Sequence, residues 1–168
     1  MALDATIGGA SADSYISVDD ADTYFGAHVT TAVWDAATVA SKEKGLKMAT
    51  RLLDQRYDWA GEKVSDSQSL RWPRSNAFDK DGDAFETNEL PLELTQATAE
   101  FAQYLLTSDT TKETDGRGLT STTVDTISVV FDKADKPDVL PDIVVEMLRG
   151  LGVVHRRGGV GSASVVRV

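Results

Sequence analysis

The chain has 168 residues, 41% of them hydrophobic, which is enough to bury a core and fits a single domain. It contains no cysteine and only two histidines, which excludes disulfides, thiol nucleophiles and cysteine metal sites and leaves little for a histidine metal cage. The net charge of -10 argues against a protein that grips phosphates. No apolar run approaches the roughly 20 residues of a membrane span, and the first residues do not resemble a signal peptide, so we expect a cytosolic protein with no membrane partner.

The charge is unevenly distributed along the chain. The first 41 residues carry six Asp and no Lys or Arg, whereas residues 146–168 carry one Glu and four Arg. This polarity predicts two faces that meet different partners.

The N-terminal third predicts an arm followed by a short helix. Residues 1–13 are rich in Gly, Ala and Ser and predict a flexible arm. Ser17 has the chemistry of a helix N-cap, and Asp20 occupies the third helical position, where a carboxylate favours the positive end of the helix. We expect this helix to run to about Ala27, and Trp34 to fill the junction with the next helix.

A long amphipathic helix is predicted from Ser41, as its N-cap, to about Trp59. Its apolar residues recur at helical spacing and must be covered by another element. Its polar face alternates basic and acidic residues, which leaves two interpretations open. The face is either solvated, with pairs such as Glu43 with Lys47, or it is a subunit contact in a ring.

The irregular passage from residue 62 to residue 91 is longer than most loops in compact domains, so it is either functional or internally packed. Trp72 lies in its middle, beside Pro73 and between Arg71 and Arg74. Such a residue can stack on nucleic-acid bases, but burial of Trp72, locking the loop onto the preceding helix, is the favoured interpretation because tryptophan buries so much apolar area.

Asp79, Asp81 and Asp83 imitate the first ligand positions of a calcium loop. The pattern then fails, because Ala84 stands where such a loop needs glycine and Leu90 where it needs a bidentate glutamate. An Asp-Gly turn between two short extended arms explains the same residues. We therefore expect no metal site and no cofactor.

The second half of the chain predicts two more helices around a β-rich excursion. The helices are expected over residues 91–108 and 141–151. Between them, a polar link leads into alternating β-branched residues at about 122–132.

The C-terminal segment over residues 153–168 combines a basic, glycine-rich hinge with a short β-prone end. That end is either a frayed tail or edge strand of its own fold, or a strand that pairs with a sheet edge on another protein.

These elements predict a mainly α fold, a four-helix bundle-like domain over residues 14–152 with a small β-rich insertion and a C-terminal β-forming docking tail. We expect the large aromatic residues and one proline to act as structural anchors of this domain. They are Tyr24, Phe25, Trp34, Trp59, Trp72 and Pro73.

An ordered set of short motifs from about Asp13 to Val168 resembles a family of tailed-phage head–tail connector proteins, whose members are sometimes labelled DnaT-like single-stranded DNA-binding proteins. No single motif is specific to this family, but the order in which the motifs follow one another is fairly specific. The motifs are DSYIS at 13–17, ADTYF at 21–25, Trp34, KGLKMATRLLD at 44–54, LRWPR at 70–74, the Asp81-Gly82 turn and VVR at 165–167.

The resemblance implies a virion structural protein that forms an adaptor ring, a dodecamer, beneath the portal protein and links the capsid to a further neck or tail-completion protein. It implies assembly in the host cytoplasm, a final place at the head–tail interface, and a lumen through which DNA passes without specific binding. It also implies docking onto the portal through the C-terminal tail. The tail residues concerned are Arg156, Arg157, Ser162, Ser164, Val165, Val166, Arg167 and Val168.

Two other functional classes stay open beside this one. A single-stranded DNA-binding module would use Trp59 and Trp72 with Arg71 and Arg74 as a stacking platform. An enzyme is the weakest class, because the sequence has no phosphate-binding loop, no complete dinucleotide fingerprint and no evident nucleophile beside either histidine. We therefore expect no catalytic residues. In the ring interpretation, the acidic N-terminal third is expected to face the lumen and repel DNA.

Overall fold

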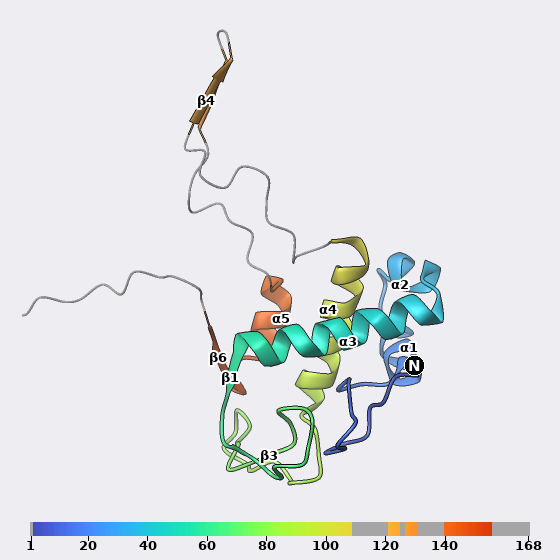
Figure 1. The fold of residues 1–168 in the computed structure, drawn as a ribbon, viewed down its shortest axis with the longest axis vertical. Helices are drawn as coiled ribbons and strands as arrows, with labels where there is room; N and C mark the ends of the chain where they lie inside the picture. Colours follow the sequence, from blue (N-terminus) through green and yellow to red (C-terminus); the bar gives the residue numbers. More distant parts are fainter. Residues whose placement is uncertain (1, 109–120, 125–126, 131–139, 156–168) are drawn as a thin grey trace, which may run out of the picture.

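The computed structural model describes residues 2–108, 121–124, 127–130 and 140–155. Over these ranges the protein is mainly helical, with five helices and three two-stranded antiparallel sheets, one helix more than expected (Figure 1). The helices are α1 (Val18–Phe25), α2 (Ala32–Ala36), α3 (Val39–Arg56), α4 (Leu92–Thr107) and α5 (Asp142–Met147).

The start of α1 is confirmed as predicted. The Ser17 hydroxyl accepts a hydrogen bond from the Asp20 amide at 3.1 Å and so satisfies one of the free amides of the first turn. The helix ends at Phe25, two residues before the expected boundary. The short helix α2 was not predicted, because five residues are too few to show a helical period. It carries the buried Trp34, whose indole nitrogen donates to Asp22 at 2.6 Å.

The prediction of Ser41 as the N-cap of the long helix was wrong. The helix α3 begins at Val39, and Thr38 is its N-cap, with its hydroxyl accepting from the Ser41 amide at 3.2 Å. Both residues have the same capping chemistry, so the sequence alone could not choose between them.

The C-terminal end of the long helix also differs from the prediction. Residues Tyr57–Trp59 are not helical but form β1, which pairs antiparallel with β6 (Gly152–Val154). A Cβ on Gly152 would lie 2.6 Å from the Asp58 carbonyl oxygen, so only glycine permits this close pairing. The final helix α5 is correspondingly shorter than expected and ends at Met147, before the turn that leads into β6.

The core lies where α3 crosses α4 in a bundle-like arrangement (Figure 1). Leu46 and Leu53 of α3 are fully buried, as is Phe101 of α4. Gly45 lies at this crossing, where a Cβ would be in ordinary contact with the Ala102 carbonyl oxygen, at 3.4 Å. No helix in the described ranges has the length and apolar composition needed to cross a membrane.

Two further small sheets complete the described structure. The strands β2 (Glu62–Lys63) and β3 (Arg74–Ser75) pair at the base of the long loop. The strands β4 (Ser121–Val124) and β5 (Ile127–Val130) pair antiparallel and confirm part of the predicted β-rich excursion.

The Asp-Gly turn is also confirmed. A bridge joins Phe78 to Ala84, and the Asp79 carboxylate accepts the amides of Asp81 and Asp83 at 2.9 and 2.8 Å. In the part of the chain that the structure describes, no cluster of three or more His, Cys, Asp or Glu side chains could hold a metal ion.

Candidate functional site

The tryptophans proposed as a stacking platform lie inside the fold. Trp59 is 8% exposed and stacks on Tyr57, with ring centroids 4.8 Å apart. Trp72 is 1% exposed and packs edge-on against Trp59 and Phe85, at centroid distances of 6.1 and 5.7 Å. Stacking on a base needs an accessible ring face. Neither indole offers one in this conformation.

Arg74 is committed to the same loop. Its Nε donates to the Ala60 carbonyl at 2.6 Å and its Nη2 to the Gly61 carbonyl at 2.5 Å. Burial lowers the pKa of the Arg74 guanidinium from its ordinary value, and the neighbouring Arg71 adds to the effect. Arg71 is exposed, so it alone of the proposed platform residues can meet a ligand without rearrangement.

The half-buried carboxylate of Asp54 joins four parts of the chain next to these tryptophans. Asp54 of α3 accepts hydrogen bonds from the Tyr15 hydroxyl at 2.5 Å, from Trp59 Nε1 at 3.1 Å and from the Arg71 amide at 3.2 Å. Burial raises the pKa of Asp54, and these three donors offset only part of the increase. Burial also raises the pKa of Tyr15 well above its ordinary value, so this phenol stays a donor at neutral pH.

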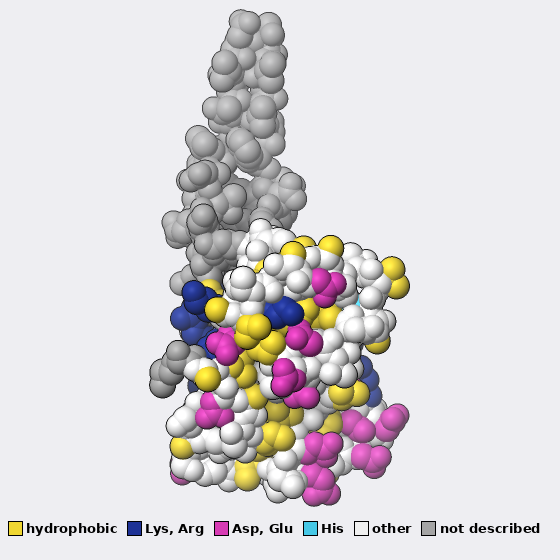
Figure 2. Space-filling model, turned by 90° about the vertical axis from the view of Figure 1, so that its right-hand side faces the viewer, with side chains coloured by type: hydrophobic (Ala, Val, Ile, Leu, Met, Phe, Trp, Pro, Cys, Tyr) yellow, Lys and Arg dark blue, Asp and Glu magenta, His cyan; other side chains and the backbone are white. Residues whose placement is uncertain are grey.

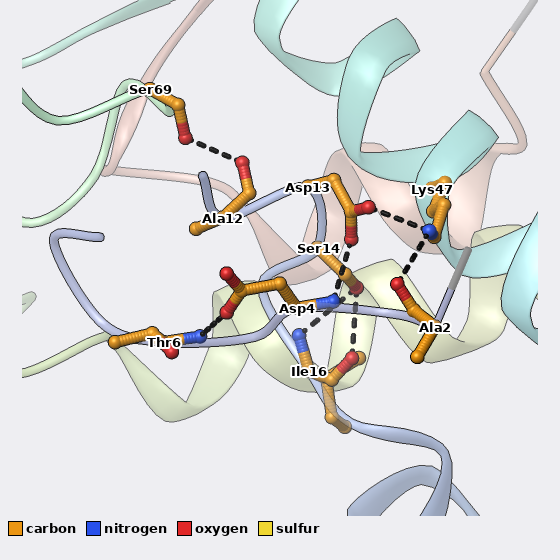
Figure 3. Close-up of polar contacts among 9 residues, drawn as sticks. All are labelled: Ala2, Asp4, Thr6, Ala12, Asp13, Ser14, Ile16, Lys47 and Ser69. Atoms are coloured by element: carbon orange, nitrogen blue, oxygen red, sulfur yellow. Dashed lines mark hydrogen bonds and ion pairs between the residues drawn. The ribbon is translucent and has the colours of Figure 1, made fainter. Parts of the chain in front are cut away.

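The N-terminal arm lies against the body of the domain (Figure 3). Asp13 forms an ion pair with Lys47 of α3 at 2.6 Å and accepts the Asp4 amide at 2.9 Å. The Ser69 hydroxyl donates to the Ala12 carbonyl. Residues 4–15 therefore run between α3 and the loop that carries Trp72, and the Asp54 network lies at the end of this path.

The other predicted anchors lie around the first two helices and the loop. Phe25 is buried against Trp34, with ring centroids 4.8 Å apart. Tyr24 is half-buried, and its hydroxyl donates to Glu100 of α4 at 3.1 Å. Pro73 is buried beside Trp72.

The strand β6 fixes the point from which the predicted docking tail starts. The His155 amide donates to the Arg56 carbonyl at 2.7 Å, and its Nε2 lies 2.7 Å from an Asp58 carboxylate oxygen. In Figure 1, β1 and β6 lie on the side of the molecule opposite α1. The tail residues proposed to dock on the portal, 156–168, lie outside the described residues.

The surface of the described body carries an excess of acid. Residues 2–108 contain nine Lys and Arg against eighteen Asp and Glu. Figure 2 shows acidic side chains gathered at the lower right of one face. A surface of this kind repels a polyphosphate chain except where cations are grouped.

A family model described as "Putative DnaT-like ssDNA binding protein" matches residues 1–168. No curated protein and no solved structure was found to match the chain. The family model therefore covers the arm, the helical body and the C-terminal segment as one unit.

Proposed function

The chain belongs to the DnaT-like ssDNA-binding family, and within this family we propose that it is a head–tail adaptor of a tailed-phage virion that does not itself grip DNA. In this proposal the protein forms a homo-oligomeric ring, a dodecamer, beneath the portal protein. The ring contacts a further neck or tail-completion protein on its other side and encloses the DNA conduit. The protein assembles in the host cytoplasm, functions at the head–tail interface and catalyses no reaction.

The burial of Trp59 and Trp72 is the observation that supports the absence of DNA binding in this proposal. Base stacking on aromatic side chains supplies much of the affinity of single-stranded DNA-binding proteins, and both indoles are used in the core. The acid excess supports the same conclusion, because an acidic conduit lets DNA slide. The ordered motifs that resemble head–tail connectors supply the specific assignment.

The mass of the assembled particle tests the ring directly. Native mass spectrometry of the protein alone and mixed with purified portal is expected to show a closed oligomer bound to the portal. A mixture in which both proteins keep their separate masses would contradict the proposal.

Deleting residues 162–168 is expected to abolish portal binding while leaving the fold intact. The described fold ends at His155, whose contacts to Arg56 and Asp58 do not involve the deleted residues. Binding is measured by co-sedimentation with purified portal, and folding by circular dichroism. The control variant Arg149→Ala removes an exposed cation outside the tail and should bind normally. Unchanged binding by the truncated chain would refute docking through the tail.

A second candidate function, single-stranded DNA binding, is favoured by the family description. Because the tryptophans are buried, the protein would have to bind single-stranded DNA through exposed cations such as Arg71. Its affinity for DNA would then fall steeply as the salt concentration rises. Fluorescence anisotropy of a labelled oligonucleotide at low salt separates the two functions. The adaptor proposal expects no binding, whereas tight, salt-sensitive binding would favour the second candidate.

A further inference from the structure

The exposed side of α3 carries unpaired positive charge. Lys44, Met48, Arg51 and Gln55 recur at helical spacing and form what we call the α3 stripe. Lys44, Arg51 and Gln55 are exposed, and an Arg51 Nη atom lies 2.8 Å from the Met48 sulfur. Within residues 2–108, neither Lys44 nor Arg51 forms an ion pair. The stripe therefore offers two free cations around an apolar centre.

A second surface has the opposite charge. Residues 78–92, here called the acidic segment, include the exposed carboxylates Asp81, Asp83, Glu86 and Glu89, with Lys80 as their only cation. In the described ranges none of these four carboxylates forms an ion pair. The segment begins with Phe78, 52% exposed, and ends with Leu92, 66% exposed. It thus combines free acid with exposed apolar side chains.

The two surfaces lie on different parts of the molecule. The α3 stripe runs along the helix that crosses the body, whereas the acidic segment belongs to the loops below it (Figure 1). Across the described residues, no ion pair joins them within one copy. Complementary patches at separate places on one chain can pair head to tail, with the α3 stripe of each copy meeting the acidic segment of the next, which is a heterologous contact.

We propose that the α3 stripe of one copy binds the acidic segment of a second copy in a head-to-tail contact. Charge pairs between Lys44 or Arg51 and the acidic segment orient the two copies, and Met48 packs near Phe78 or Leu92. DNA is the weaker occupant of the stripe, because two cations neutralise few phosphates and the rest of the described surface repels them. The contact itself needs only this protein; its closure into a ring rests on the proposed function.

Charge reversal tests the contact in the full-length protein. The wild type is expected to self-associate at low salt in analytical ultracentrifugation and to dissociate at high salt. The variants Lys44→Glu/Arg51→Glu and Asp83→Lys/Glu86→Lys should each weaken self-association by about 100-fold or more, because like charges then face each other. An equimolar mixture of the two variants restores opposite charges at each contact and should recover association.

A matched control separates this contact from general charge effects. Asp66→Lys changes an exposed acid outside the acidic segment. It should associate like the wild type, and circular dichroism should show all variants folded.

Three results would overturn the inference. They are a wild type that stays monomeric at low salt, a mixture of variants that fails to recover association, and an α3 variant that associates normally but loses oligonucleotide binding. The same variants are then mixed with purified portal. If these variants self-associate like the wild type and also bind the portal, the inference fails and the proposed function stands.

Discussion

Replacing Trp72 with alanine is expected to lower the free energy of unfolding by about 3–5 kcal/mol, the range for removing a large buried aromatic residue. Trp72 is 1% exposed and contacts both Trp59 and Phe85. The substitution therefore leaves a cavity where the long loop packs against the core. Urea unfolding followed by far-UV circular dichroism measures the loss without relying on tryptophan fluorescence.

Trp72→Phe provides the matched control. In the described structure the Trp72 indole nitrogen is buried without a hydrogen-bond partner, so phenylalanine removes an unsatisfied donor along with some volume. We expect Trp72→Phe to lower the free energy of unfolding much less than Trp72→Ala does, and to leave any oligonucleotide binding unchanged. If Trp72 instead stacks on bases, alanine would cost under about 1 kcal/mol of stability and would weaken DNA binding.

The parts of the fold that the sequence predicted are those fixed by local chemistry. Ser17 and Asp20 specify the start of α1, and the apolar period of residues 92–107 specifies α4. The pairing of β1 with β6 could not be predicted in this way. In the sequence, Tyr57 and Trp59 continue the apolar spacing of α3. They are extended because they pair with β6, which is distant in the sequence and approaches closely at Gly152.

The candidate site shows the same limit. The sequence favoured a buried Trp72 over a stacking one, and the structure buries it. It did not assign Asp54 a role, because one acidic residue at the border of an amphipathic helix is equally compatible with a solvated face. Its donors come from positions 15, 59 and 71, and only tertiary structure brings them together.

Replacing Asp54 with alanine is expected to lower the free energy of unfolding by about 2–4 kcal/mol, because it leaves buried donors unpaired. The Tyr15 hydroxyl and Trp59 Nε1 both donate to the same carboxylate oxygen, Oδ1, while the Arg71 amide donates to the other. In Asp54→Asn the amide oxygen can keep the first two bonds, but its NH2 group would face the Arg71 amide. Asparagine should therefore cost less than alanine.

The same pair of proteins, wild type and Asp54→Asn, tests the raised pKa of Asp54. Burial lifts the pKa of the folded state above the ordinary value of 3.8, so the folded protein binds this proton more tightly than the unfolded chain does. Protonated Asp54 therefore stabilises the folded protein. This contribution is complete below pH 3.8 and is lost as the pH rises through the higher pKa of Asp54 in the folded state. Thermal unfolding between about pH 3 and pH 7 should show the stability of the wild type falling relative to Asp54→Asn across that interval, since the asparagine does not titrate. Parallel curves would mean that hydrogen bonding from Tyr15, Trp59 and Arg71 fully compensates the burial of the carboxylate, and a difference of the opposite sign would mean that it overcompensates.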